Sequence, residues 1–522
     1  MQSYTKWWRR KTISCVQPTT QISPEWFELE KAIQSRNLYA VAARIQPWCR
    51  LPEAAICTLK AYANYSGFTS LEVNKIEAFF EFYSTKTDLA FERARQHMKE
   101  HGFDMDLHIM SLFCLYLSNQ FEDALVFQRQ LSSLEEASID RPDYWKMICL
   151  IRWANNDMNS LEVATDRAVE LAPDDGNLLQ TALNIYIELG AHYKIKTLRA
   201  KLVDRLEHQG YNLAICLLAL GEYELGGQLM EGRYDENESH RMINPGLKSS
   251  PRWRGESLVG ARLLLSAEQG TGDTIQMARY LSLLSSTGCN QVLLETSTET
   301  LTLLQYNFPE IVMVARRWEQ APELGFDLWT GMMSLPHLLN AWGKTQPGCS
   351  GYLRVPPENT LYWKDRVEEL SPTKKPKIGL AWSGKRSHRA DLRRSIPFEQ
   401  MMRSIRNLNV IFFSLQTNVP KILPANLIDV SEELITFADT AALIEQMDIL
   451  ITVDTSVVHI AGALGKATWL LLPKRYEWRW GLEGEENDWY DSVKVIRQTE
   501  HANWAAVLQE VFEHRLPEQF NF

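Results

Sequence analysis

Residues 263–276 read LLLSAEQGTGDTIQ, and this stretch decides the fold because an apolar strand runs into a glycine turn and then into a helix. Gly270 and Gly272 allow the backbone to bend sharply and a ligand to approach closely. Apolar residues follow at helical spacing over residues 275–281,. Asp273 therefore stands at a helix start, either as a cap, since Asp is a favoured capping residue, or as the carboxylate of a site. The loop expected around it comprises Gln269, Gly270, Gly272 and Gln276.

Residues 448–465, DILITVDTSVVHIAGALG, have the same organisation of a buried strand that leads into a helix. A further apolar strand over residues 467–472 completes a strand-helix-strand unit, which predicts a parallel sheet,. Thr455 and Ser456 then lie at a helix N-terminus, where free N–H groups and the helix dipole favour an anion such as a diphosphate. The alternative interpretation is that these hydroxyls are ordinary caps and that His459 is a core histidine.

Residues 377–397, KIGLAWSGKRSHRADLRRSIP, combine a strand with a basic loop and a helix that proline opens. Open α/β sheets bind ligands beyond the carboxyl ends of their strands, which is where this loop lies. The chain as a whole carries a net charge of −10. Local basicity in an acidic chain indicates one anionic ligand rather than a nucleic-acid surface, and a solvated loop is the alternative.

Taken together, these stretches resemble the GT-B glycosyltransferases of family 9, the heptosyltransferase type, in the branch fused to tetratricopeptide repeats. The resemblance covers about residues 250–500. Its marks are Pro251-Arg252-Trp253-Arg254-Gly255, Glu268-Gln269-Gly270 with Gly272-Asp273-Thr274, Trp382-Ser383-Gly384, and Val453-Asp454-Thr455-Ser456 with His459. The aromatic segments Trp478-Arg479-Trp480 and Trp489-Tyr490 also resemble the family's C-terminal segment, and core packing of these rings is the alternative,.

The resemblance implies two Rossmann-like halves, with the acceptor mainly on the first and a nucleotide-sugar on the second, and a mechanism without metal or cofactor. It implies that Asp273 is the catalytic base and that Arg394 takes the place of a phosphate-binding lysine, with a different geometry. For Gln416, which ends a strand, a polar strand end without a ligand is the alternative. The donor-binding residues expected are Ser383, Gly384, Lys385, Arg394, Gln416, Asp454, Thr455, Ser456 and His459.

The region before these halves has the pattern of helical repeats. Apolar residues recur at three- and four-residue spacing, and turn-like sites begin at residues 119, 156, 190 and 221. Their intervals of 37, 34 and 31 residues lie near the period of tetratricopeptide repeats, about 34 residues. We therefore predict an all-α solenoid, a fold whose concave face commonly holds a polypeptide.

The length of 522 residues is sufficient for about three domains,. The predicted divisions are an N-terminal segment over 1–37, TPR-like repeats over 38–235, a linker over 236–251, a first Rossmann-like half over 252–365 and a second over 366–522. Strands are predicted at 261–267, 291–295, 311–315 and 326–329, and then at 377–382, 409–415, 448–453, 467–472 and 493–497. A C-terminal helix over 501–515 is expected to cross back to the first half.

The eight cysteines are scattered and form no C-x-x-C pair. This pattern indicates neither a zinc site nor a disulfide framework and favours a reducing cytosol. No apolar run approaches the span of a membrane, and no apolar segment follows the basic N-terminus,. We therefore expect a cytoplasmic protein without a transmembrane segment.

The function predicted is that of an inverting glycosyltransferase, which moves a sugar from a nucleotide-sugar to a protein acceptor docked by the repeats, such as flagellin or another surface protein. Asp273 would be the general base, and the basic loop with the helix start at Thr455 would stabilise the leaving diphosphate. One alternative is a transferase acting on a glycolipid or oligosaccharide. The other is a non-catalytic repeat scaffold with a degenerate transferase half.

Overall fold

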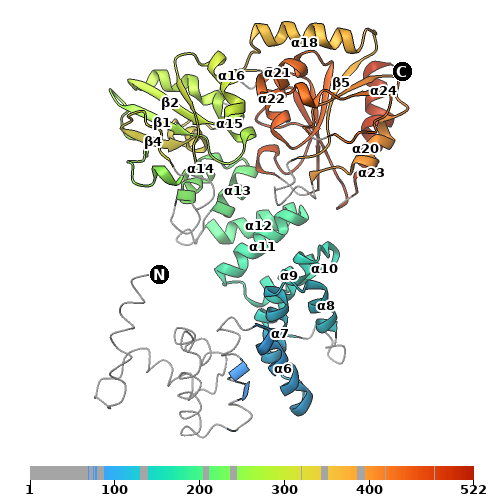
Figure 1. The fold of residues 1–522 in the computed structure, drawn as a ribbon. Helices are drawn as coiled ribbons and strands as arrows, with labels where there is room; N and C mark the ends of the chain where they lie inside the picture. The colour runs from blue at the N-terminus through green and yellow to red at the C-terminus, as the bar shows by residue number, and fades with distance from the viewer. Residues whose placement is uncertain are drawn as a thin grey trace. The chain divides into compact units, whose positions relative to one another are not determined.

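The computed structural model describes residues 69, 74, 75, 77 and 78 and the ranges 87–129, 139–203, 211–234, 244–318, 320–342, 351–384, 394–417, 419–474, 477–501 and 503–521. The segment predicted over residues 1–37 lies outside them. The chain falls into two compact units, the first ending at Pro173 and the second beginning at Asp174 (Figure 1). Among the described residues, no helix has both the length and the apolar character needed to cross a bilayer.

The first unit is helical where it is described. Its helices are α6 (Thr87–His101), α7 (Met105–Leu117), α8 (Phe121–Arg129), α9 (Pro142–Ala154) and α10 (Met158–Leu171). Asn119 separates α7 from α8, and Asn156 separates α9 from α10, each with a left-handed backbone at φ 58° and 59°. Asn adopts this conformation more readily than most residues, so each predicted turn reverses the chain between two helices.

The second unit begins with two more helix pairs. They are α11 (Gly176–Leu189) with α12 (His192–Val203), and α13 (Tyr211–Ala219) with α14 (Tyr223–Met230). Gly190 and Gly221, at φ 61° and 77°, form the turns inside the pairs, which confirms the remaining turn predictions. The repeats predicted as one domain over 38–235 are therefore divided at Pro173, and the last two pairs pack with the α/β part of the chain.

A four-stranded parallel sheet follows the repeats. Its strands are β1 (Arg262–Ser266), β2 (Gln291–Thr296), β3 (Val312–Ala315) and β4 (Leu328–Gly331), in the order β3-β2-β1-β4. The helical segments between them are α15 (Thr271–Met277), η7 (Ala278–Thr287) and α16 (Thr298–Asn307), with α17 (Leu335–Leu338) after β4. The strands predicted for the first half are confirmed to within two residues at each end.

The second sheet has six parallel strands in the order β10-β9-β8-β5-β6-β7. They are β5 (Lys377–Ala381), β6 (Ile411–Ser414), β7 (Leu427–Ile428), β8 (Ile449–Val453), β9 (Thr468–Leu472) and β10 (Val493–Arg497). The helices are α18 (Pro357–Leu370), α20 (Phe398–Ile405), α21 (Phe437–Glu445), α22 (Ser456–Leu464), α23 (Trp504–Gln509) and α24 (Leu516–Phe520), with short helical segments η11 (Trp478–Trp480) and η12 (Glu510–Arg515). Among the strands of this sheet, only β7 was not predicted from the sequence, because a strand of two residues is too short to show a periodic pattern.

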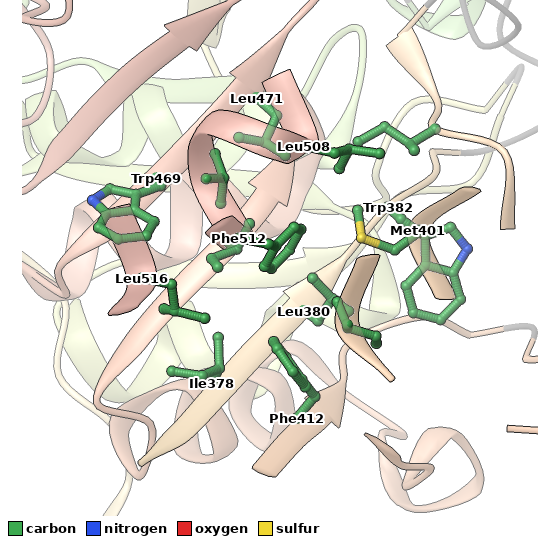
Figure 2. Close-up of a cluster of buried hydrophobic side chains, with 14 of the residues drawn as sticks. Ile378, Leu380, Trp382, Met401, Phe412, Trp469, Leu471, Leu508, Phe512 and Leu516 are labelled. Carbon is green, nitrogen blue, oxygen red and sulfur yellow. The ribbon is translucent and has the colours of Figure 1, made fainter. Parts of the chain in front are cut away.

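The C-terminal helices pack on the second sheet, so the expectation that they cross back to the first half is wrong. Phe512 lies against Phe412 of β6 with ring centroids 6.1 Å apart. Leu508 and Leu516 enter the same buried cluster as Ile378 of β5 (Figure 2). The apolar face of these helices covers a face of the second sheet, and the removal of both apolar surfaces from water favours this packing.

A buried ion pair joins the end of the repeats to the first sheet. Arg233, just after α14, donates from Nε and Nη2 to the two carboxylate oxygens of Glu268, at 2.8 and 2.7 Å. Both side chains are only 1% exposed. Glu268 follows β1 directly and also accepts a hydrogen bond from the backbone N–H of Met333. The last repeat is thereby fixed to the loop that precedes α15.

Arg233→Met is expected to destabilise the second unit by about 3–5 kcal/mol, because removal of one partner leaves a buried carboxylate uncompensated. Arg366→Met is the matched control, since Arg366 pairs with Glu433 where the two side chains are 29% and 26% exposed. The control should cost about 1 kcal/mol or less. Urea unfolding measures both values, and equal costs would contradict the structural role assigned to Arg233.

Candidate functional site

The strand orders locate one switch point in each sheet. In the first sheet β1 lies between β2 and β4, so the chain leaves it to one side and later returns to the other. In the second sheet β5 and β8 are neighbours from which the strand order runs in opposite directions. Ligands of open α/β sheets bind beyond the carboxyl ends of the strands at such points. The loops after β1, β5 and β8 contain most of the residues predicted from the sequence.

The loop after β1 forms a tight start to α15. Gly270 is the N-cap, and Asp273 is the third residue of the helix rather than its cap. The Oδ2 atom of Asp273 accepts a hydrogen bond of 2.7 Å from the Gly270 N–H. This single bond satisfies a backbone donor at the helix start, so one carboxylate oxygen of Asp273 has a structural role.

The other oxygen of Asp273 accepts a hydrogen bond from Arg479, which also bonds to Glu477. Arg479 donates from Nε to Oε1 of Gln276 at 2.7 Å, and its guanidinium lies 4.2 Å from the ring centroid of Trp478. Burial alone would lower the pKa of Arg479, but the neighbouring carboxylates raise it above its ordinary value. A permanent cation from the second half therefore faces the predicted catalytic carboxylate of the first.

Sequence reasoning did not assign Arg479 or Glu477 to the site. Arg479 appeared there only within the aromatic segment Trp478-Arg479-Trp480. Its side chain is 8% exposed, and a charged residue between two tryptophans is the signal that marks it. A charge in such an apolar setting is rarely buried unless it is paired.

The loop after β8 leads into α22. Thr455 is the N-cap, and its hydroxyl accepts a hydrogen bond from the Val457 N–H. Asp454 accepts hydrogen bonds from Trp480 Nε1 at its side chain, over 3.3 Å, and from Arg394 Nη1 at its carbonyl, over 3.0 Å. Burial raises the pKa of the Asp454 carboxyl, while Arg479 and Arg394 oppose the shift. The structure thus brings the predicted Arg394 and Asp454 together at the second switch point.

The loop after β5 is organised by Gln416. Its Oε1 accepts from the backbone N–H and the hydroxyl of Ser383, both at 2.7 Å, and its Nε2 donates to the Ser383 carbonyl at 3.0 Å. Both ends of the amide are thus occupied within the protein, as the polar strand-end interpretation requires. The Gly384 N–H donates to the Ser395 hydroxyl at 3.1 Å. Lys385, predicted to bind the donor, lies outside the described residues.

His459 packs beneath the loops rather than on their open side. It is 5% exposed, its Nδ1 lies 3.1 Å from the Tyr490 hydroxyl, and its ring stacks on Trp480 at a centroid distance of 5.4 Å. Burial lowers its pKa well below the ordinary range, so the ring is neutral. A satisfied core histidine has these properties.

Two of the predicted loop residues have packing roles. A Cβ atom at Gly272 would lie 2.7 Å from the His459 ring, so this glycine lets α15 and α22 approach each other. The expectation that Gly272 leaves room for a ligand is replaced by this contact. Gln276 is fully buried and orients Arg479 instead of lining an open loop. Gly270 is the exposed member of the turn.

This chain is similar to a curated protein and to solved structures at low sequence identity. No protein-family model matches it. Protein FlbA of Caulobacter vibrioides is 24% identical over 433 residues, which cover 76% of this chain and 70% of that protein. A family 9 glycosyl transferase from Veillonella parvula has a TM-score of 0.37 and 11% identity, and covers 50% of this chain and 91% of that chain.

A mutant of the Thermobaculum terrenum O-GlcNAc transferase has a TM-score of 0.25 and 10% identity, and covers 78% of this chain and 84% of that chain. The strand orders and helix pairs described above define the fold of this chain. A family 9 glycosyl transferase is thus among the solved structures to which the chain is similar.

Proposed function

We propose that this protein is a glycosyltransferase of the GT-B type that takes a sugar from a nucleotide-sugar. One observation carries the proposal: Arg479 links Asp273, at the first switch point, to the loop of Asp454 at the second. A site built from the loops of two sheets suits a reaction between two bound molecules. The motifs quoted for the family 9 resemblance supply the same residues independently.

The reaction requires an acceptor group to displace a nucleoside diphosphate from the anomeric carbon of the sugar. Asp273 is the proposed base for the acceptor proton, a role typically worth about 10²–10⁴ in rate. Its two oxygens already accept from Gly270 and Arg479, but each carboxylate oxygen has a second lone-pair direction. Attack from the face opposite the leaving group inverts the anomeric centre.

The leaving diphosphate develops negative charge as the bond to the sugar breaks. Arg394 and the N-terminal end of α22, at Thr455 and Ser456, are the groups proposed to receive it. Charge stabilisation by fixed donors in a site that excludes water is usually the largest single contribution to catalysis. The proposal requires no metal ion, because these cationic and N–H groups supply the positive potential.

The proposed acceptor is a protein held by the repeats, since helical solenoids commonly bind polypeptides on an extended surface. The solved O-GlcNAc transferase, whose match covers 78% of this chain, is by its name also a transferase of a sugar. A glycolipid or oligosaccharide acceptor remains the alternative, together with a scaffold that binds nucleotide without transfer.

A thermal-shift screen of nucleotide-sugars and nucleoside diphosphates tests the donor half of this proposal. A ligand that binds only the folded state at a hundred times its Kd stabilises that state by about 2.7 kcal/mol. We expect a shift with one nucleotide class and none with nucleosides. The absence of a shift with every diphosphate would contradict the proposal, whereas binding without sugar release would favour the scaffold alternative.

Arg394→Ala is expected to weaken nucleoside diphosphate binding by about 1.5–3 kcal/mol, because a charge-assisted phosphate contact is lost. Calorimetry on the folded variant measures the change. Arg403→Ala is the matched control, since this exposed arginine of α20 bonds only to a carbonyl of its own helix among the described contacts. Unchanged affinity in Arg394→Ala would remove Arg394 from the site.

A further inference from the structure

The turn before α15 contains an unusual backbone conformation. Gln269 has φ 59°, in the left-handed region that L-residues enter only at a cost in free energy. It is the exception among the non-glycine residues that the structure describes with positive φ, because the others are all asparagine: Asn119, Asn156, Asn340 and Asn521. A long side chain such as glutamine lacks the local hydrogen bonding that favours asparagine there. Some other contact must therefore hold Gln269 in place.

That contact comes from the helical repeats. Gln269 donates from Nε2 to the hydroxyl oxygen of Tyr211, the first residue of α13, at 3.3 Å. The preceding residue, Glu268, is held by Arg233 just after α14. Two consecutive residues of the turn are thus fixed by partners from the last repeat pair. The next residue of the turn, Gly270, donates its N–H to the carboxylate of Asp273.

The same helix also contacts the partner of Asp273. α13 packs against η11, the segment that carries Arg479. Burial raises the pKa of Tyr211 to about 12, so the phenol stays neutral and keeps its hydroxyl proton at ordinary pH. Asp273 and Arg479 belong to different halves, 206 residues apart, and α13 adjoins the segments that carry both.

We propose that Tyr211 is a positioning residue of the transfer site: its hydroxyl holds Gln269 in the left-handed conformation that sets Asp273 beside Arg479. The last repeat pair then belongs to the reaction centre and not to acceptor docking. Helices α11–α14 are part of the second compact unit, in agreement with this role. The role of Tyr211 in sugar transfer rests on the proposed function. Its role in fixing the conformation of Gln269 does not depend on that function.

Hydrogen exchange of the full-length protein tests the hold directly and needs no substrate. Tyr211→Phe removes only the hydroxyl, and we expect the amides of residues 270–274 to exchange about two- to tenfold faster, the factor that one neutral hydrogen bond is worth. Tyr223→Phe is the matched control, since Tyr223 of α14 donates its hydroxyl to Asp488, away from this turn. Unchanged exchange in Tyr211→Phe, or an equal increase in Tyr223→Phe, would overturn the proposal.

Gln269→Asn provides the rescue. Asparagine occupies the other left-handed non-glycine positions that the structure describes. It favours this conformation by its own local hydrogen bonding, so the turn should no longer depend on Tyr211. The double variant Tyr211→Phe with Gln269→Asn is expected to exchange like Gln269→Asn alone. Faster exchange in the double variant would show that Tyr211 acts through some other contact and would refute the assigned route.

Kinetics with the donor identified by the nucleotide-sugar screen then test the connection to transfer. Tyr211→Phe should lower kcat about two- to tenfold with an unchanged KM for the donor, whereas a merely destabilised fold would lower the melting temperature and leave kcat per folded molecule intact. An unchanged kcat would refute the positioning role even with altered exchange. If no donor supports transfer, the proposed function fails, and the exchange measurement alone decides whether Tyr211 holds the turn.

Discussion

Asp273→Asn is expected to lower the rate of sugar transfer by about two to four orders of magnitude, the usual contribution of a positioned general base. Nucleoside diphosphate affinity should persist, because the proposed phosphate contacts come from Arg394 and the start of α22. Asparagine keeps one oxygen and no charge, so one of the acceptors for Gly270 and Arg479 is lost. This loss should cost about 1.5–3 kcal/mol of stability, which makes a rate per folded molecule the appropriate measurement.

Glu477→Gln separates the catalytic role of Asp273 from its structural one. Glu477 is the other carboxylate that accepts from Arg479, so this variant weakens the same guanidinium pairing without touching the proposed base. We expect a comparable loss of stability and a rate within about tenfold of the wild type, since the base itself remains. Single-turnover transfer by Asp273→Asn at a near wild-type rate, or equal losses in both variants, would reduce Asp273 to an acceptor for the Gly270 N–H and an ion-pair partner of Arg479.

Removal of residues 1–173 is expected to leave a folded protein that still binds nucleoside diphosphates but no longer modifies an intact protein acceptor efficiently. The cut follows the division between the two compact units. Loss of a second binding module should lower transfer to the protein acceptor by about 10²–10⁴-fold. Transfer to a short peptide acceptor at high concentration should change little, which provides the internal control. An undiminished rate on the intact protein would exclude docking by the first unit.

Removal of residues 1–234 is expected to have a different outcome, because it also deletes α11–α14. Glu268 would lose Arg233 and remain as a buried, unpaired carboxylate, at a cost of about 3–5 kcal/mol,. The contacts of Tyr211 with Gln269 and of Tyr223 with Asp488 would disappear as well. Stabilities of folded domains are only about 5–15 kcal/mol, so we expect this protein to unfold or aggregate. A cooperative melting transition equal to that of the shorter truncation would contradict the integral role of these helices.

The sequence by itself determined the local elements. Period-two and period-3.6 apolar patterns depend on neighbours in the chain, and so the strands of both sheets except β7, and the four repeat turns, could be predicted,. The left-handed conformations at Asn119, Asn156, Gly190 and Gly221 follow from residue types that tolerate them,. The candidate carboxylate Asp273 and the helix start at Thr455 were likewise visible, because a glycine turn or a cap after a strand is a short-range signal.

Only the tertiary structure decided which distant residues meet. Arg479 reaches Asp273 across 206 positions of the chain, and Tyr211 reaches Gln269 across 58. No local pattern encodes such a pairing, since it depends on how two sheets and a helix pair bury their faces against one another. The destination of the C-terminal helices on the second sheet was decided in the same way, because an apolar helix face is compatible with any complementary surface and the packed core selects one,.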